Sequence, residues 1–136
     1  MKPTPRLCLA VAVGGALGAV LRHLLGELVP DGDGFAWTTF AINVTGAFLL
    51  ALLPALSGVR RSPAWTVALG PGVLGGYTTL SAYAEQSRAL LAEGRVVLAA
   101  TYVVGTFAAC AVAVLAAATW SSRAEQDLLA NDGGAG

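Results

Sequence analysis

The stretch GVLGGYTTLSAYAEQ, residues 72–86, decides how the rest of the chain is interpreted. It gathers three glycines, two adjacent threonines, a serine, two tyrosines and a glutamate. Gly70 and Pro71 stand just before it, and both glycine and proline weaken a helix. We therefore predict that a helix breaks in this stretch and that polar groups gather around the break.

The sequence around this stretch is apolar enough to enter a lipid bilayer. Of 136 residues, 56% are hydrophobic and only 12% are charged, which is unusual for a soluble domain and normal for a membrane protein. Four apolar runs are long enough to cross a hydrocarbon core of about 30 Å, which needs about 20 residues. The predicted spans are residues 7–29, 35–57, 64–91 and 96–120.

The predicted fold class is an all-α membrane protein with four transmembrane helices, of which the third is broken. Residues 1–122 form this transmembrane domain, and residues 123–136 are a polar, Gly-rich tail that we expect to be flexible. The first span is not expected to be a signal peptide, since it is long and contains Arg22. Cys8 and Cys110 are expected to be small packing residues. We do not expect an enzyme, because the sequence offers no soluble domain, no Ser–His or Cys–His spacing and no metal-ligand cluster.

Charged residues predict how the spans are oriented. With four spans, both termini and the second connection share one side of the membrane, and the other two connections share the opposite side. The first side carries Lys2, Arg6, Arg60, Arg61 and Arg123. The second side carries two cations, Arg88 and Arg95, and the acids Asp31, Asp33 and Glu93. Since cytoplasmic connections are enriched in lysine and arginine, we predict a multi-pass cell-membrane protein with both termini in the cytoplasm.

The first two spans carry residues that need partners inside the membrane. Asn43 lies well inside the second span and shares a helical face with Thr39. Such a polar row suits a pore lining or hydrogen bonding between helices, and the sequence leaves both open. Gly14 and Gly18 form a GxxxG pair that suits close helix contact, either within the chain or between subunits. Arg22 must either reach the membrane interface or find a partner.

The predicted break has chemical consequences. Irregular backbone survives in lipid only where it is buried in protein or lines a cavity, because the freed carbonyls must be satisfied. Freed carbonyls are also good ligands for a hard cation. Thr78, Thr79 and Ser81 then offer hydroxyls, and Tyr83 offers a ring and a hydroxyl. This is more broken and polar backbone than helix packing alone requires, so it indicates an ion site.

Three motifs together resemble the Fluc/CrcB family of fluoride channels. GGALGAVLRH, residues 14–23, is similar to the family's Gly-Gly-x-x-Gly-Ala-x-x-Arg-Tyr. TTFAINVTGAFLL, residues 38–50, is similar to its Gly-Thr-Leu-x-x-Asn-x-x-Gly-x-Phe. Residues 72–86 resemble its Gly-Phe-x-Gly-Gly-x-Thr-Thr-Phe-Ser-Thr-Phe. The motifs match in order and spacing over nearly the whole chain.

The resemblance implies a subunit that works as an antiparallel, dual-topology-type dimer with two fluoride pathways along the dimer interface. It implies passive export of fluoride from the cytoplasm and a structural sodium ion, Na+, at the centre. The backbone carbonyls of Gly75 and Thr78 would hold the sodium ion. The fluoride pathway would be lined by Asn43, Leu80, Ser81 and Tyr83, with Arg22, Thr39, Thr79 and Tyr102 as supporting polar residues.

This chain departs from the family pattern at side chains expected to meet fluoride. Leu80 and Tyr83 stand at the two phenylalanine positions of the third motif. Gln86 stands where a glutamate is usual, with Glu85 just before it, and His23 replaces the tyrosine of the first motif. These departures and the clear charge bias lead to the hypothesis that the chain is one half of a heterodimer whose homologous partner inserts in the opposite orientation. A homodimer is the alternative.

Two other classes of function stay open. One is a non-conducting or partner-dependent membrane subunit, which the departures at Leu80 and Tyr83 favour. The other is a small multidrug transporter, which is also a four-helix antiparallel dimer but needs a carboxylate in the middle of its first span. Here the first acid is Glu27, at the end of that span, which argues against a transporter. The lipid bilayer is an expected partner, and nucleic acid is not.

Overall fold

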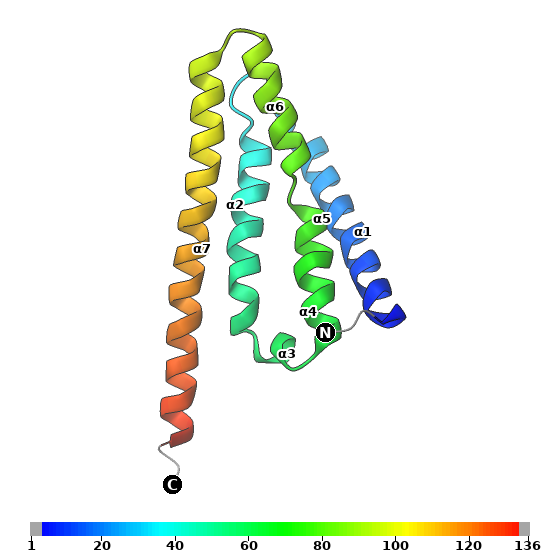
Figure 1. Ribbon diagram of the computed structural model, residues 1–136, viewed down its shortest axis with the longest axis vertical. Helices are drawn as coiled ribbons and strands as arrows, with labels where there is room; N and C mark the ends of the chain where they lie inside the picture. The colour runs from blue at the N-terminus through cyan, green and yellow to red at the C-terminus, as the bar shows by residue number, and fades with distance from the viewer. Residues whose placement is uncertain (1–3, 134–136) are drawn as a thin grey trace.

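The computed structural model describes residues 4–133, with side chains as far as residue 122, and this part of the chain is helical without a strand (Figure 1). The elements are α1 Pro5–Leu28, α2 Trp37–Leu52, η1 Leu53–Ala55, α3 Ser57–Arg60, α4 Pro63–Val67, η2 Ala68–Leu74, α5 Gly75–Tyr77, α6 Leu80–Ala92 and α7 Val96–Gly133. Three stretches are helices long and apolar enough to cross a membrane: Pro5–Leu28, Trp37–Ala55 and Val96–Ser122. They agree with the first, second and fourth predicted spans.

The third predicted span contains the predicted interruption. The segment from α4 to α6 is a series of short helical pieces, and η2 is a π-helical stretch with Pro71 inside it. A π-helical turn is wider than an α-helical turn, so it accommodates the proline ring and the missing N–H. The backbone leaves helical geometry later, at Thr78 (ψ 156°) and Thr79 (φ −143°, ψ 111°). The glycine-rich part is therefore helical, and the break follows it.

Glycines let α1 lie directly against the interrupted segment. A β-carbon on Gly18 would collide with the carbonyl oxygen of Val73, and one on Gly14 would collide with the carbonyl oxygen of Ala68. A β-carbon on Gly76 would in turn collide with the backbone of Gly15. The contact therefore depends on small residues on both sides. It answers one question that the sequence left open, because the GxxxG face of α1 serves contact within the chain.

The remaining helices complete one layer-like bundle (Figure 1). Helix α7 runs alongside α2, and the α4–α6 segment lies between α2 and α1. A buried cluster of Ala36, Leu90, Ala99 and Tyr102 closes the end where α6 turns into α7. Elsewhere many large apolar side chains are exposed, among them Phe107 and Val97. An apolar surface of this extent suits lipid or a partner subunit rather than water.

Helix α1 begins and α7 ends at the same end of the bundle as α3, and the connections 29–36 and 93–95 lie at the other end (Figure 1). This is the grouping that we used to predict orientation, although the side that faces the cytoplasm stays a prediction. The helix α7 extends to Gly133, well beyond the predicted end of the fourth span at residue 120. Good helix formers between 123 and 130 account for the extension, since they continue an existing helix at low cost. Residues 134–136 of the expected flexible tail lie outside the described residues.

Candidate functional site

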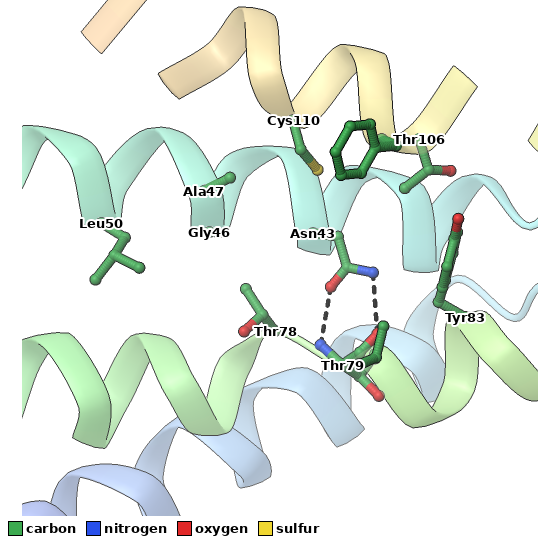
Figure 2. A pocket seen from close by; sticks show the side chains of 11 residues that line it. Asn43, Gly46, Ala47, Leu50, Thr78, Thr79, Tyr83, Thr106 and Cys110 are labelled. Atoms are coloured by element: carbon green, nitrogen blue, oxygen red, sulfur yellow. Dashed lines mark hydrogen bonds between the residues drawn. The ribbon is translucent and has the colours of Figure 1, made fainter. Parts of the chain in front are cut away.

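The break in the third span is held by a side chain from α2. The Thr79 backbone N–H donates to Asn43 Oδ1 over 2.8 Å, and Asn43 Nδ2 donates to the Thr79 carbonyl over 3.1 Å (Figure 2). We call this pair of bonds the Asn43–Thr79 clasp. Gly46, one helical turn further along α2, has no side chain to keep Thr78 away, and a β-carbon there would collide with the Thr78 methyl group. The sequence thus places an amide, Asn43, and a glycine, Gly46, where α2 meets backbone that lacks helical hydrogen bonds.

Thr79 also starts the helix that follows the break. Its hydroxyl Oγ1 accepts a hydrogen bond from the Ala82 N–H over 3.1 Å, which is the usual role of an N-cap threonine. The Ser81 hydroxyl lies 3.2 Å from the same oxygen. Thr79 is buried, so its backbone and side chain need these partners. The supporting role predicted for Thr79 therefore has a structural basis on both sides of the break.

The clasp and the cap together free two backbone carbonyls. In a continuous helix the Gly75 carbonyl would accept from the Thr79 N–H, which here donates to Asn43. The Thr78 carbonyl would accept from the Ala82 N–H, which here donates to the Thr79 hydroxyl. Gly75 and Thr78 are the two residues predicted to hold a cation. Their carbonyls thus lose their helical partners, as a backbone cation site requires.

Arg22 approaches the same segment from α1. Its Nε donates to the Gly76 carbonyl over 3.2 Å, across 54 residues of sequence. That carbonyl belongs to the last turn before the break, where carbonyls lack intrahelical donors. Of the two alternatives for Arg22, the structure therefore shows a specific partner. Arg22 does not line the cavity described next.

A cavity of about 330 Å³ opens beside the clasp (Figure 2). It is lined by Asn43, Gly46, Ala47, Leu50, Thr78, Thr79, Leu80, Tyr83, Thr106, Phe107 and Cys110. The Thr106 hydroxyl on α7 is buried and has no hydrogen-bond partner in the part of the chain that the structure describes. Leaving a buried hydroxyl unpaired costs about 1–3 kcal/mol. The Thr106 side chain lines the cavity, but its hydroxyl oxygen is covered by protein atoms, so it would reach an occupant of the cavity only after a turn about its χ1 bond.

A line of polar side chains leads from this cavity toward the end of the bundle that holds Asp31. The Tyr83 hydroxyl donates to the Val103 carbonyl over 3.0 Å, and its ring lies 5.3 Å from that of Tyr102, centroid to centroid. The Tyr102 hydroxyl donates to Gln86 Oε1 over 2.7 Å. Tyr102 is fully buried, and its ring and that of Phe35 pack in a T-shaped arrangement. The predicted residue Tyr102 therefore links the cavity wall to a second polar group.

That second group is centred on a carboxylate. Gln86 Nε2 donates to Asp31 Oδ2 and to the Thr39 hydroxyl, each over 3.0 Å. Asp31 also accepts from the Thr38 and Thr39 N–H groups at the start of α2, over 2.7 and 3.2 Å, and from the Thr39 hydroxyl over 2.7 Å. Glu85, the acid closest to the family's glutamate, instead forms an exposed ion pair with Arg88. Gln86, and not Glu85, thus faces the interior.

The structure therefore sorts the residues predicted from sequence. Asn43, Thr78, Thr79 and Tyr83 meet at one cavity, with Ser81 bonded to Thr79 and Leu80 at the cavity edge, largely exposed. Thr39 and Tyr102 belong to the Asp31 group, Gly75 begins the short helix α5 before the break, and Arg22 reaches the Gly76 carbonyl from α1. Whether these residues bind ions stays a prediction.

Sequence reasoning missed six of the eleven residues that line the cavity, among them the three on α7, and it missed Asp31 of the polar group. Thr106 and Cys110 follow Tyr102 at intervals of four on α7, so they share its helical face. That spacing was the signal that could have found them, and Phe107 adjoins Thr106. Asp31 was interpreted only as a charge in a connection. Its role as an acceptor for the start of α2 depends on the path of residues 29–36, which no local pattern specifies.

These observations define the class of protein: a small helical membrane protein built around a clasped break in one of its helices. The chain belongs to the CrcB family. Residues 9–118 match the family model described as CrcB-like protein, Camphor Resistance (CrcB). The match covers α1 through most of α7, including the clasp and the cavity.

Several relatives carry the name of a channel. A protein of Nocardia farcinica named fluoride-specific ion channel FluC 2 is 38% identical over 130 residues, which are 88% of this chain and 90% of that protein. The fluoride-specific ion channel FluC of Rhizobium meliloti is 42% identical over 112 residues, 79% of this chain and 90% of that protein. The protein of the same name from Thermus thermophilus is 44% identical over 106 residues, 72% of this chain and 81% of that protein. The family is one of ion channels, not enzymes.

Proposed function

We propose that the chain is a subunit of a fluoride-selective ion channel that lets fluoride leave the cytoplasm passively and so lowers its concentration there. The observation that carries the proposal is a cavity beside the clasped break that is walled mainly by apolar side chains and lined by the Asn43 amide and aromatic rings. The names of the relatives supply the ion, since each of the three is called fluoride-specific.

The cavity offers the donors that a dehydrated fluoride ion needs. An asparagine amide nitrogen carries two protons, and one suffices for the Thr79 carbonyl, so Asn43 can offer the other. Thr106 would add its hydroxyl after a turn about its χ1 bond, since the oxygen is covered by protein atoms in this conformation. Phe107 and Tyr83 add ring edges, which carry partial positive charge and suit an anion. In the proposed dimer the second subunit would narrow this cavity, and a narrow path walled mainly by apolar carbon and small donors favours a small anion over a larger one, such as chloride.

The proposal includes a structural sodium ion at the break. The Gly75 and Thr78 carbonyls fit such an ion, because their helical donors bond to Asn43 and Thr79 instead. When bound, the cation would offset the negative charge of fluoride in a low-dielectric site. The chain's own contribution is to hold the two carbonyls away from helical bonds. Without the clasp, the Thr79 N–H would be available to donate to the Gly75 carbonyl, as it does in a continuous helix.

A second subunit completes the proposed channel. Leu80 is 78% exposed and Phe107 is 75% exposed, yet both belong to the cavity wall. In an antiparallel dimer these side chains would be covered, and the cavity would become an enclosed path. The same dimer would place the breaks of the two third spans together at the centre. In this proposal the interrupted segment crosses the membrane as well, so each subunit has four spans. We propose a partner that is a homologue of opposite orientation, with a homodimer as the alternative.

The alternative function is a non-conducting or partner-dependent subunit of such a dimer. It is favoured by Leu80, which has no ring edge to offer an anion, and by Tyr83, whose hydroxyl is committed to the Val103 carbonyl. A small multidrug transporter is less well supported. Its chemistry needs a carboxylate within the first span, and the first acid in α1 is Glu27, near the end of the helix.

Fluoride efflux from liposomes, recorded with a fluoride electrode, tests the proposal. The purified chain is compared with the chain co-expressed with a homologue from the same cell, with chloride efflux as the selectivity control. Efflux from the chain alone supports a homodimer, and efflux only with the homologue supports the heterodimer. No fluoride efflux from either preparation, with both folded, would overturn conduction and support the non-conducting subunit.

A separate measurement tests the sodium ion. Sodium is exchanged for N-methylglucamine at constant ionic strength, and thermal dissociation of the purified protein is followed by size-exclusion chromatography. A ligand that binds only the folded state at 100 times its Kd stabilises that state by about 2.7 kcal/mol. We therefore expect a lower dissociation temperature without sodium. An unchanged temperature would argue against a structural cation.

A further inference from the structure

We propose that Asp31 is a positioning residue of the fluoride path: through Gln86 and Tyr102 it holds the Tyr83 wall of the cavity in place. Asp31 is not one of the residues that line that cavity. The inference rests on the proposed function for its effect on fluoride, and on hydrogen bonds alone for its structural part.

The direction of each hydrogen bond follows from the carboxylate. An ionised carboxylate only accepts, so the Thr39 hydroxyl and the Gln86 amide must both donate to Asp31. The Gln86 nitrogen has two protons, and the second goes to the Thr39 hydroxyl oxygen. The Gln86 amide is thereby fixed in one of its two orientations. Its oxygen must face Tyr102, and the Tyr102 hydroxyl must donate to it.

The chain of contacts continues to the cavity. The buried Tyr102 ring packs against the Tyr83 ring, and Tyr83 is part of the cavity wall. Without an acceptor at Gln86, the buried Tyr102 hydroxyl would be unpaired, and the ring would move to find a partner. Residues that bind an ion need neighbours that lock their rotamers. Asp31, in the connection between α1 and α2, restrains the Gln86 side chain and through it Tyr102.

Asp31 is also an acceptor for the start of α2, so a stability loss alone would not test the inference. The two roles use the two carboxylate oxygens differently. Oδ1 accepts from the Thr38 N–H, whereas Oδ2 accepts from Thr39 and Gln86. In Asp31→Asn the amide nitrogen can take the place of Oδ1, where it opposes one donor, the Thr38 N–H. The amide oxygen then takes the place of Oδ2 and still accepts from Thr39 and Gln86. Asp31→Asn should therefore keep the Gln86 bond, and Asp31→Ala should lose it.

The first experiment observes Tyr102 without any need for conduction. Ultraviolet resonance Raman spectra of the full-length protein are recorded, and the Tyr102→Phe spectrum is subtracted to isolate Tyr102. The intensity ratio of the tyrosine doublet reports whether a phenol hydroxyl donates or accepts. We expect a strong donor in the unmodified protein and in Asp31→Asn, and loss of that signature in Asp31→Ala and Gln86→Leu. A donor signature that survives in folded Asp31→Ala would overturn the inference.

The second experiment measures fluoride efflux from the same variants. Asp31→Ala and Gln86→Leu should each lower the efflux rate about tenfold, and the double variant should be no slower than either, since both break one chain of contacts. Asp33→Ala, in the same connection and with the same change of charge, is the matched control and should stay near the unmodified rate. Additive losses in the double variant would overturn the inference. If the unmodified protein shows no efflux either alone or with the co-expressed homologue, the proposed function fails, while the Raman result still decides the role of Asp31.

Discussion

The side-chain amide of Asn43 binds both polar backbone groups of Thr79, the N–H at 2.8 Å and the carbonyl at 3.1 Å. A single side chain on α2 thus replaces the helical partners that this residue of the third span lacks. Because the amide has both a donor and an acceptor, asparagine and glutamine are the residue types that complete such a pair. Asn43 is therefore as much a part of the break as the backbone that it holds.

The clasp predicts a specific cost for Asn43→Asp. The aspartate still accepts from the Thr79 N–H, but its second oxygen faces the Thr79 carbonyl with no proton to offer. We expect the free energy of unfolding to fall by about 1–3 kcal/mol, the cost of an unsatisfied buried polar group. Thermal dissociation followed by size-exclusion chromatography measures the change. Thr45→Val, at an exposed position of the same helix, loses a solvent-exposed hydrogen bond to Tyr77, so it is the control and should cost less than Asn43→Asp. Equal stability of Asn43→Asp and the unmodified protein would contradict the role of the clasp.

The contact of α1 with the interrupted segment predicts an intolerance of methyl groups. Gly18→Ala places a β-carbon on the Val73 carbonyl, so the two segments must separate. Overpacking of this kind costs about 1–3 kcal/mol or more. The yield of folded protein from membranes should fall sharply. Gly26→Ala is the matched control, because no atom lies within 4 Å of a β-carbon at that position. Similar yields of the two variants would show that the contact is looser than the structure indicates.

The unpaired Thr106 hydroxyl behind the cavity wall predicts opposite effects on stability and conduction. Thr106→Val keeps the shape of the side chain and removes a buried hydroxyl that lacks a partner. Stability should stay the same or rise, since that hydroxyl costs free energy when it is unpaired. Fluoride efflux should fall about tenfold or more if the Thr106 hydroxyl turns toward the ion about χ1, because a hydrogen bond to a charged group contributes about 1.5–3 kcal/mol. Thr101→Val, an exposed position on α7, is the control. Unchanged efflux in Thr106→Val would remove this hydroxyl from the path.

The departure at Leu80 predicts a gain of function. Leu80→Phe adds a ring edge at an exposed position of the cavity wall, where the side chain has room to turn. Aromatic contacts contribute about 0.5–1.5 kcal/mol, which corresponds to about a two- to tenfold change in rate. We expect efflux through the chain without a partner to increase by that factor. Leu91→Phe, also exposed on α6 but outside the cavity, should have no such effect. If both variants behave alike, the ring at position 80 has no particular role.

The sequence predicted the spans more accurately than the break. Apolar runs of sufficient length identified α1, α2 and α7, because the hydrocarbon thickness fixes the length of a span. Pro71 and its neighbouring glycines indicated where a helix is weakened, but the chain bends away at Thr78 and Thr79 instead. The outcome there depends on Asn43, which lies in another helix. Local propensity does not contain that information.

The candidate site shows the same limit. Asn43, Thr79 and Tyr83 were found from the sequence because they are polar residues in apolar surroundings, which need a reason to be there. Thr106 was missed because a threonine in a helix usually bonds to its own backbone, and only the structure shows that this one does not. Asp31 was missed because a charged residue in a connection normally faces solvent. Its partners come from α2 and α6, which meet it only in the folded chain.

The glycine contact between α1 and the interrupted segment also bears on how the protein is made. Its two sides are far apart in sequence, as the 54-residue separation of Arg22 and Gly76 illustrates. During synthesis α1 and α2 therefore emerge from the ribosome before the segment that α1 needs. The glycine face of α1 has to wait in the bilayer or beside the insertion machinery, and the segment with the weakest hydrophobic signal then inserts against a surface already shaped to receive it.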